Sequence, residues 1–122
     1  MAKKILIIDD EPDVAKMLVL RLKAKGYEVS VSADAKEGLA ALEAFRPDLL
    51  LLDYHLSDML APIFVQEMRA KGLGQIPVIL ITATTESVTK KAQECSAADY
   101  ILKPIEPEEL YEKVSKYLSA SA

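Results

Sequence analysis

The most constraining feature of this sequence is a run of four leucines, from Leu49 to Leu52, that is followed at once by Asp53. Four consecutive leucines do not alternate between apolar and polar positions, so a strand that contains them must be buried on both faces. Such an environment exists at the centre of a parallel sheet that is covered by helices on both sides. The run therefore predicts an α/β fold, and it places the acid Asp53 at the end of a central strand.

Other short apolar runs predict further strands, and each one precedes a segment with helical spacing of its apolar residues. The expected strands cover residues 5–8, 27–31, 48–53, 77–81 and 100–102. The expected helices cover residues 13–25, 35–45, 86–95 and 107–118, with one more that Pro62 opens and Gly72 closes. Strands that alternate with helices through right-handed crossovers form a three-layer, doubly wound (βα)5 fold with a parallel sheet.

Length, composition and charge fit one cytoplasmic domain that covers residues 1–122. The chain is 51% hydrophobic and 28% charged, as in ordinary soluble globular proteins, and no segment approaches the length of a membrane span. Its formal net charge of −4 argues against direct binding of nucleic acid. The one cysteine, Cys95, excludes an internal disulfide and suits a reducing compartment.

Chemically active side chains follow four of the five expected strands. Asp9 and Asp10 follow the first strand, Asp53 the third, Thr82 the fourth and Lys103 the fifth. Because the carboxyl ends of parallel strands meet at one edge of the sheet, these side chains are expected to lie together. Asp53 taken alone is better explained as a helix cap or a solvated loop residue, and the residues at the other strand ends overturn that explanation in favour of a functional site.

These residue types suit the chemistry of a phosphoryl group. Carboxylates that share a pocket repel one another, which raises the pKa of at least one of them unless a cation is bound. Oxygen ligands favour Mg²⁺, while a lysine and a hydroxyl neutralise and hydrogen-bond phosphoryl oxygens. The set indicates that Asp53 is a nucleophile toward phosphorus. A dinucleotide or flavin site is disfavoured, because the turn from Asp9 to Pro12 contains no glycine.

The motifs, in this order and spacing, resemble the receiver domain of response regulators in two-component and phosphorelay signalling, of the chemotaxis-regulator type. The resemblance extends from Lys4 to Leu118. It rests on Asp9-Asp10, the apolar strand that ends in Asp53, Thr82-Ala83, and Tyr100 followed three residues later by Lys103-Pro104.

The resemblance implies a role for each matched residue. Asp53 is the phosphoacceptor, Thr82 and Lys103 contact the phosphoryl oxygens, and Tyr100 changes rotamer together with Thr82 on activation. The implied Mg²⁺ ligands are Asp9, Asp10, Asp53 and the backbone carbonyl of His55.

The resemblance also implies a flavodoxin-like fold, a strand order of 2-1-3-4-5 and a cis peptide between Lys103 and Pro104. The implied phosphodonor is a histidine kinase or a histidine phosphotransfer protein, and the implied target is a downstream output protein or domain. Such a domain is a signalling switch that catalyses only its own phosphorylation and dephosphorylation.

The loop after Asp53 departs from the common family pattern. Ser57, Leu60 and Ala61 stand where a proline and an acid-glycine pair are usual, and Ser96 stands where a glycine is usual. These departures leave the matched site residues unchanged and affect the expected conformation of the loop and the rate of phosphate loss. His55 is either an inert loop residue or a group that obstructs or orients the hydrolytic water.

Three other functions compete with this interpretation. A phosphatase or phosphotransferase for small substrates generally needs a second acid two residues after the nucleophile, where this chain has His55. A degenerate receiver that only mediates contacts normally lacks one of the matched groups, and this chain keeps them all. A purely structural protein leaves the cluster of acids without an explanation.

Two helices have distinctive apolar patterns. The segment 86–95 carries a thin stripe of Val88, Ala92 and Cys95, which predicts a weakly anchored helix. The first helix has its inward stripe at Val14, Met17, Leu18 and Leu22, and a second apolar pair at Ala15 and Val19. We expect that pair to form a docking patch for the phosphodonor beside the metal ligands.

Overall fold

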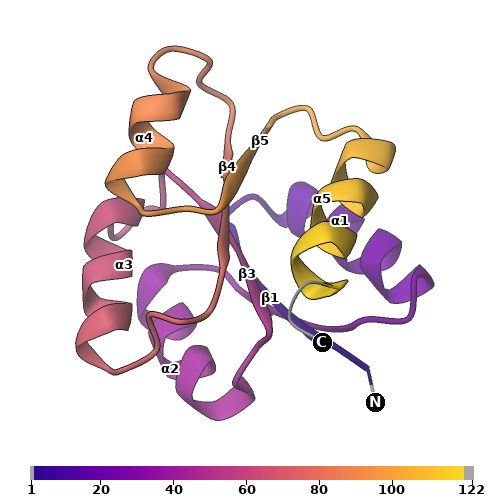
Figure 1. Cartoon of the computed structure of the whole chain (residues 1–122), viewed down its shortest axis with the longest axis horizontal. Coiled ribbons are helices and arrows are strands. Elements are labelled where there is room, and N and C mark those ends of the chain that lie inside the picture. Colours follow the sequence, from indigo (N-terminus) through magenta and orange to yellow (C-terminus); the bar gives the residue numbers. More distant parts are fainter. Residues whose placement is uncertain (1, 120–122) are drawn as a thin grey trace.

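The computed structural model describes residues 2–119, in which five strands alternate with five helices (Figure 1). The strands are β1 (Lys4–Ile8), β2 (Glu28–Ser32), β3 (Leu49–Asp53), β4 (Val78–Thr82) and β5 (Asp99–Leu102). The helices are α1 (Pro12–Ala24), α2 (Ala35–Phe45), α3 (Ala61–Ala70), α4 (Val88–Glu94) and α5 (Pro107–Ser119). None of the helices in this part of the chain has the length and apolar character of a membrane span.

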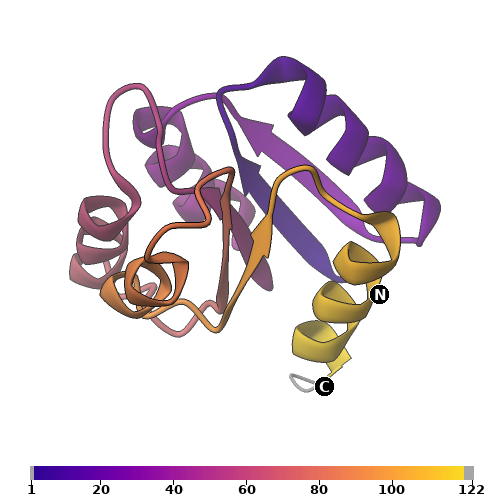
Figure 2. The ribbon, with the colours of Figure 1, turned by 90° about the horizontal axis from the view of Figure 1, so that it is seen from above.

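The five strands form one parallel sheet in the order β2-β1-β3-β4-β5, which confirms the expected topology. The sheet lies between α1 and α5 on one side and α2, α3 and α4 on the other (Figure 2). β3 is therefore the central strand of a three-layer fold. The peptide between Lys103 and Pro104 is cis, as the family resemblance implies.

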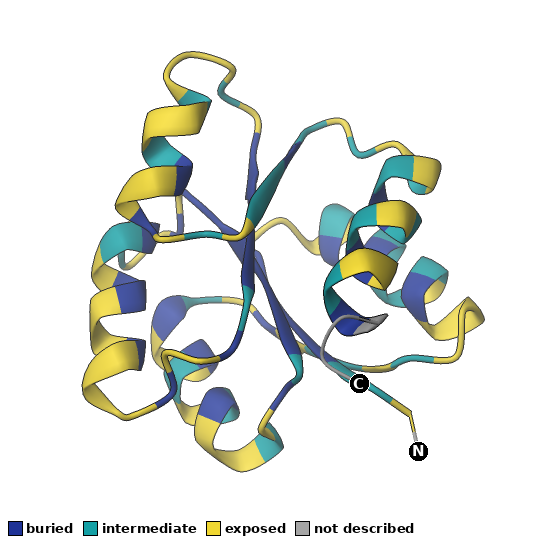
Figure 3. Ribbon diagram, viewed as in Figure 1, coloured by how far each residue is buried: buried dark blue, intermediate teal, exposed yellow. Residues whose placement is uncertain are grey.

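The run of leucines supplies both hydrophobic cores at once. Leu50 and Leu52 pack in the core beneath α2, α3 and α4, while Leu49 and Leu51 pack in the core beneath α1 and α5. All of them have 0% exposure, and the sheet is buried along its centre in Figure 3. Since burying a leucine side chain contributes about 2 kcal/mol, this strand fixes the centre of the fold.

Most element boundaries lie within one or two residues of their predicted positions. The second strand begins at Glu28 instead of Tyr27, because Gly26 adopts a left-handed φ of 90° and the chain is still turning there. α4 begins at Val88 instead of residue 86, because Ser87 before it has a left-handed φ of 56° that a helix does not continue.

Gly38 weakens α2 intrinsically, yet packing requires a glycine at this position. A Cβ atom on Gly38 would lie 2.4 Å from Cδ1 of Ile8 and 3.3 Å from Cε2 of Phe64. Both of those side chains are fully buried, so they have little freedom to move away. The absent side chain lets α2 approach the end of β1, just before Asp9.

Cys95 is a buried core residue at the C-terminal end of α4. Burial, together with the nearby charge of Glu94, raises the pKa of its thiol to about 12. The thiolate form is therefore scarce at neutral pH, which favours a structural role for Cys95 over that of a nucleophile.

α4 is the least anchored helix of the described chain, as its thin apolar stripe predicts. Ala92 is the only buried residue within its seven residues, and Val88 is half-buried. The last helix, α5, instead buries Leu110, Val114 and Leu118. Less buried apolar area means that α4 opens locally at a lower free-energy cost than α5.

We expect hydrogen exchange to distinguish these two helices. Backbone amides of α4 should exchange at least about tenfold faster than those of α5 under native conditions, because fewer apolar contacts must break for α4 to open. Exchange measured by mass spectrometry or NMR at residue resolution checks this. Equal or stronger protection of α4 would show that its anchoring lies elsewhere.

Candidate functional site

The parallel sheet brings the four predicted strand ends to one edge. Asp9 directly follows β1, Asp53 ends β3, Thr82 ends β4 and Lys103 directly follows β5. Backbone hydrogen bonds hold these ends in register beyond the strands: the amide of Tyr54 donates to the carbonyl of Ile81 at 3.0 Å. The amide of Lys103 donates to the carbonyl of Thr82 at 2.9 Å.

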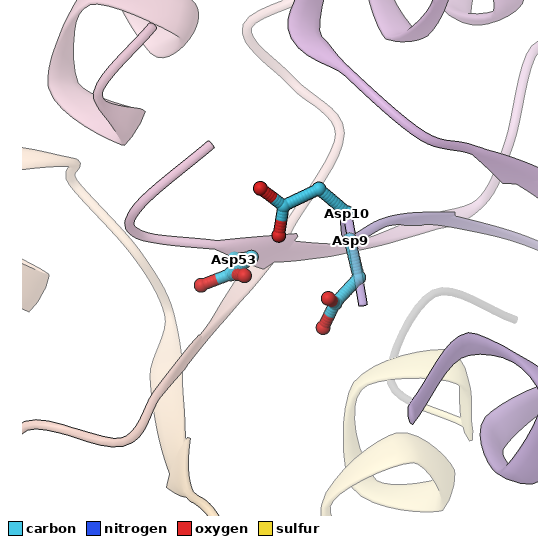
Figure 4. Close-up of side chains that lie close together, drawn as sticks. All are labelled: Asp9, Asp10 and Asp53. Carbon is cyan, nitrogen blue, oxygen red and sulfur yellow. The ribbon is translucent and has the colours of Figure 1, made fainter. Parts of the chain in front are cut away.

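Three carboxylates converge at this edge, as Figure 4 shows for Asp9, Asp10 and Asp53. Each offers an oxygen, and these oxygens lie within 4.8 Å of one another. Asp9 is 2% exposed and Asp53 is 5% exposed, whereas Asp10 is open to solvent. Local amides fix both buried carboxylates: Glu11 N donates to Asp9 Oδ1 at 2.9 Å, and His55 N donates to Asp53 Oδ1 at 3.2 Å.

The ammonium group of Lys103 lies among these acids. Its Nζ atom is 3.2 Å from Asp9 Oδ2, 3.4 Å from Asp53 Oδ2 and 2.5 Å from Glu11 Oε1. Burial lowers the pKa of Lys103, but the hydrogen bond that Lys103 donates to Glu11 and the charges of Asp53 and Asp9 outweigh burial and raise the pKa. The lysine therefore stays protonated and positively charged at neutral pH.

Asp53 has a pKa of about 6, raised from an ordinary value of 3.8. Burial is the largest cause; the charge of Lys103 opposes it, and the charge of Asp9 adds to it. The predicted rise in the pKa of one carboxylate therefore occurs, but burial contributes more to it than repulsion between the acids. A buried carboxylate that is poorly compensated is a strong candidate for a functional group.

The donor set fits a hard divalent cation. Asp9 Oδ2 is buried and accepts no hydrogen bond, and its contact with Lys103 is an ion pair without hydrogen-bond geometry. A buried oxygen that accepts no hydrogen bond, beside two further carboxylates, matches the oxygen ligands that Mg²⁺ selects. The His55 ring is exposed and stacks edge-on against Tyr54, and the role of its backbone carbonyl stays a prediction.

The two expected switch residues occupy neighbouring strands. Thr82 is 1% exposed, and its hydroxyl oxygen accepts a hydrogen bond from the amide of Thr84 at 3.2 Å. Tyr100 is half-buried on β5, and Lys113 Nζ donates to its carbonyl and lies 5.2 Å from its ring centroid. These contacts describe where the residues lie, and their coupled movement stays a prediction.

Sequence reasoning missed two residues at this edge. Glu11 contacts Lys103 more closely than Asp53 does. The sequence pattern around Glu11 does not predict this contact. Asp58 ties the loop after Asp53 to the start of α2, where its carboxylate accepts from Ala35 N at 2.9 Å and Lys36 N at 3.1 Å. This tether gives the loop a fixed attachment despite its departures from the family pattern.

Comparison with known proteins gives a consistent result. The family model for the response regulator receiver domain matches residues 5–115. The DNA-binding response regulator MtrA of Mycolicibacterium smegmatis is 36% identical over 115 residues, which are 93% of this chain and 50% of MtrA. The chain thus spans about half the length of the curated relatives it matches.

Solved structures agree in fold over nearly the whole chain. The chemotaxis response regulator CheY4 of Vibrio cholerae matches with a TM-score of 0.88 and 26% identity, over 96% of this chain and 99% of CheY4. The receiver domain of the sensor histidine kinase PA1611 from Pseudomonas aeruginosa matches with a TM-score of 0.85 and 25% identity, over 98% of this chain and 99% of that domain. That receiver domain has a magnesium ion coordinated in its active site cleft.

The raised pKa of Asp53 predicts a pH-dependent stability effect. Between pH 3.8 and about 6 the folded protein holds the Asp53 proton more tightly than the unfolded chain, so ionising this group destabilises the fold as pH rises. Without divalent cations, Asp53→Asn should raise stability by about 1–3 kcal/mol near neutral pH.

The gain from Asp53→Asn should vanish toward about pH 4, where the wild-type carboxyl is protonated in the folded state. Denaturant unfolding near neutral pH and at about pH 4, with EDTA present, measures the difference in the free energy of unfolding between the variant and the wild type. Glu67→Gln, at an exposed position of α3, is the control for removing a surface charge. A stability gain for Asp53→Asn that is equal at both pH values would contradict the assigned cause.

Proposed function

The chain belongs to the response-regulator receiver family, and on that premise we propose that Asp53 is its phosphoacceptor. The observation that carries this assignment is the position of the Lys103 ammonium, 3.4 Å from Asp53 Oδ2 at the edge of the sheet. Asp53 is the acid that ends the central strand, and its second oxygen, Oδ1, is held by the amide of His55. The carboxylate is thus oriented with a positive charge beside it.

We propose that phosphoryl transfer proceeds by direct attack of an Asp53 carboxylate oxygen on the phosphorus of a phosphohistidine. A phosphorus–oxygen bond to Asp53 forms while the phosphorus–nitrogen bond to the donor imidazole breaks. The leaving nitrogen keeps the bonding electron pair and takes up a proton. Lys103 neutralises charge on the transferred oxygens, and the Thr82 hydroxyl donates a hydrogen bond to one of them.

The ligands we propose for Mg²⁺ are Asp9, Asp10, Asp53 and the backbone carbonyl of His55. The Asp9 Oδ2 atom, which is buried and accepts no hydrogen bond, and the close approach of the three carboxylates support this assignment. When bound, the ion supplies positive charge that offsets the repulsion between these carboxylates and the incoming phosphoryl group. Asp9 also forms an ion pair with Lys103, so its carboxylate would contact both the Mg²⁺ ion and the lysine ammonium.

The family acts as a signalling switch. We propose that this domain catalyses only its own phosphorylation and dephosphorylation, and that Thr82 and Tyr100 relay the change to the face formed by α4, β5 and α5. The backbone bond between Lys103 and Thr82 and the weak anchoring of α4 support this route. Residues 1–122 would then act as one cytoplasmic receiver unit that signals to a downstream output protein or domain and contacts no nucleic acid itself.

Site variants should separate the two central residues. Asp53→Asn should abolish uptake of a phosphoryl group from acetyl phosphate with Mg²⁺, because the nucleophile is gone. Lys103→Ala should keep slow uptake, because it removes a charge that stabilises transfer and leaves the nucleophile intact. Intact mass spectrometry measures the added phosphate and its lability to base. Undiminished labelling of the Asp53→Asn protein would remove Asp53 from its proposed role.

An apolar groove beside the acids supports a docking site for the phosphodonor. It measures about 740 Å³, lies between α1 and β2, and begins at Asp9 and Asp10. Its other lining residues are Pro12, Ala15, Lys16, Val19, Leu20, Lys23, Val31 and Ala33. The expected pair of Ala15 and Val19 needs correction, because Ala15 is buried at 7% exposure while Leu20 is exposed at 74%.

We expect Leu20→Glu to slow transfer from a phosphohistidine-bearing partner by at least about tenfold, because a charge would be desolvated at the contact. Labelling by acetyl phosphate should stay unchanged, since Leu20 lies outside the acid cluster. Ile63→Glu, at a position of α3 that is 48% exposed, is the matched control on the opposite face of the sheet. Equal transfer to the wild-type and Leu20→Glu proteins would place docking elsewhere.

A further inference from the structure

The ammonium of Lys103 has a closer partner than the acid it is proposed to serve. Its distance to Glu11 Oε1 is 2.5 Å, against 3.4 Å to Asp53 Oδ2, and Lys103 donates a hydrogen bond in both of these ion pairs. Glu11 is not among the carboxylates that converge on the candidate metal position. Its contact with Lys103 therefore calls for an explanation of its own.

The backbone around Glu11 directs its side chain toward Lys103. The amide of Glu11 donates to Asp9 Oδ1, and its carbonyl accepts from Ala15 N at 3.0 Å at the start of α1. Pro12 restricts Glu11 to an extended conformation, and Glu11 has φ −93° and ψ 107°. Although Glu11 occupies the N-cap position of α1, its side chain does not cap the helix.

The two members of this ion pair differ strongly in exposure. The Lys103 side chain is 11% exposed, whereas the Glu11 side chain is 58% exposed. If the pair separates, water can solvate the glutamate at once, while the lysine stays in the site with Asp9 and Asp53. Separation therefore costs little free energy for the glutamate, because water replaces its contact with Lys103.

A phosphoryl group on Asp53 would compete with Glu11 for the same ammonium. Four carboxylates already surround this edge, those of Asp9, Asp10, Glu11 and Asp53, and Lys103 is the one cation in contact with Asp9, Glu11 and Asp53 in the described chain. An added phosphoryl group brings more negative charge to Asp53, and its oxygens compete for the Lys103 hydrogen bond that Glu11 accepts.

We propose that Glu11 is a releasable counter-ion that holds Lys103 while Asp53 is unmodified and gives it up when Asp53 carries a phosphoryl group. Glu11 is thus a positioning residue that acts through Lys103 and sets how readily the domain accepts and retains the phosphoryl group. This inference rests on the proposed function of Asp53. It predicts that weakening the contact favours the phosphorylated form.

Three variants test the inference. Glu11→Gln removes the charge, and Glu11→Asp keeps the charge but shortens the side chain by one methylene, which breaks the contact. Asp13→Asn removes an exposed acid from the first turn of α1, in the groove that Lys103 also lines, without touching the ion pair. Calorimetry measures binding of Mg²⁺ alone and then of beryllofluoride, which mimics a phosphoryl group on a carboxylate, and labelling by acetyl phosphate gives the rate of uptake.

We expect Glu11→Gln and Glu11→Asp both to bind beryllofluoride about three- to tenfold more tightly than the wild type, the size of one partly exposed ion pair. Both should also take up phosphate faster from acetyl phosphate, while Asp13→Asn stays within about twofold of the wild type. Mg²⁺ affinity should not increase in any of these variants, since none of them adds a ligand or removes a competing cation.

Three results would overturn the inference. Unchanged or weaker beryllofluoride binding by Glu11→Gln would show that Lys103 is not held back, and a parallel loss of Mg²⁺ affinity would make Glu11 a support of the metal instead. An equal gain in beryllofluoride affinity for Asp13→Asn, with Glu11→Asp unchanged from the wild type, would show that the gain comes from lowering the negative charge near the site and not from breaking the contact with Lys103. If the wild-type protein takes up no phosphate at all, the proposed function of Asp53 fails instead.

Discussion

The burial of β3 on both faces is the constraint on which the rest of the structure depends. A strand whose leucines pack alternately into two cores must lie at the centre of the sheet, and the helices must then cover both sides. The same burial surrounds the last residue of the strand, Asp53, and removes water from its carboxylate. Fold and chemistry are therefore linked, because the packing that stabilises the domain also raises the pKa of its candidate nucleophile.

The site is electrostatically unbalanced as it stands. Asp9 and Asp53 are buried acids that share the ammonium of Lys103, and Asp9 keeps one oxygen without a hydrogen bond. An excess of buried negative charge suits this edge to the hard cation and the phosphoryl group that we propose for it. The buried acids that make the site reactive also destabilise the fold, and the two hydrophobic cores offset this cost.

The sequence predicts this fold well because one-dimensional patterns determine it. The leucine run identifies the central strand, and Asp53, Thr82 and Lys103 follow from where strands end. Side-chain contacts between distant segments are not encoded in that way: the contacts of Glu11 with Lys103 and of Asp58 with the start of α2 depend on the folded backbone. Exposure within a helix is similarly hard to predict, so Leu20 was not expected in the groove.

The state of Cys95 has a practical consequence for the study of this domain. Its thiol is fully buried and stays protonated far above neutral pH, so thiol-directed dyes and spin labels will react with it slowly in the folded protein. A cysteine introduced at an exposed position can then be labelled selectively without first removing the native one. Distance measurements can then test the proposed movement of the face formed by α4, β5 and α5 in a chain with no other substitution.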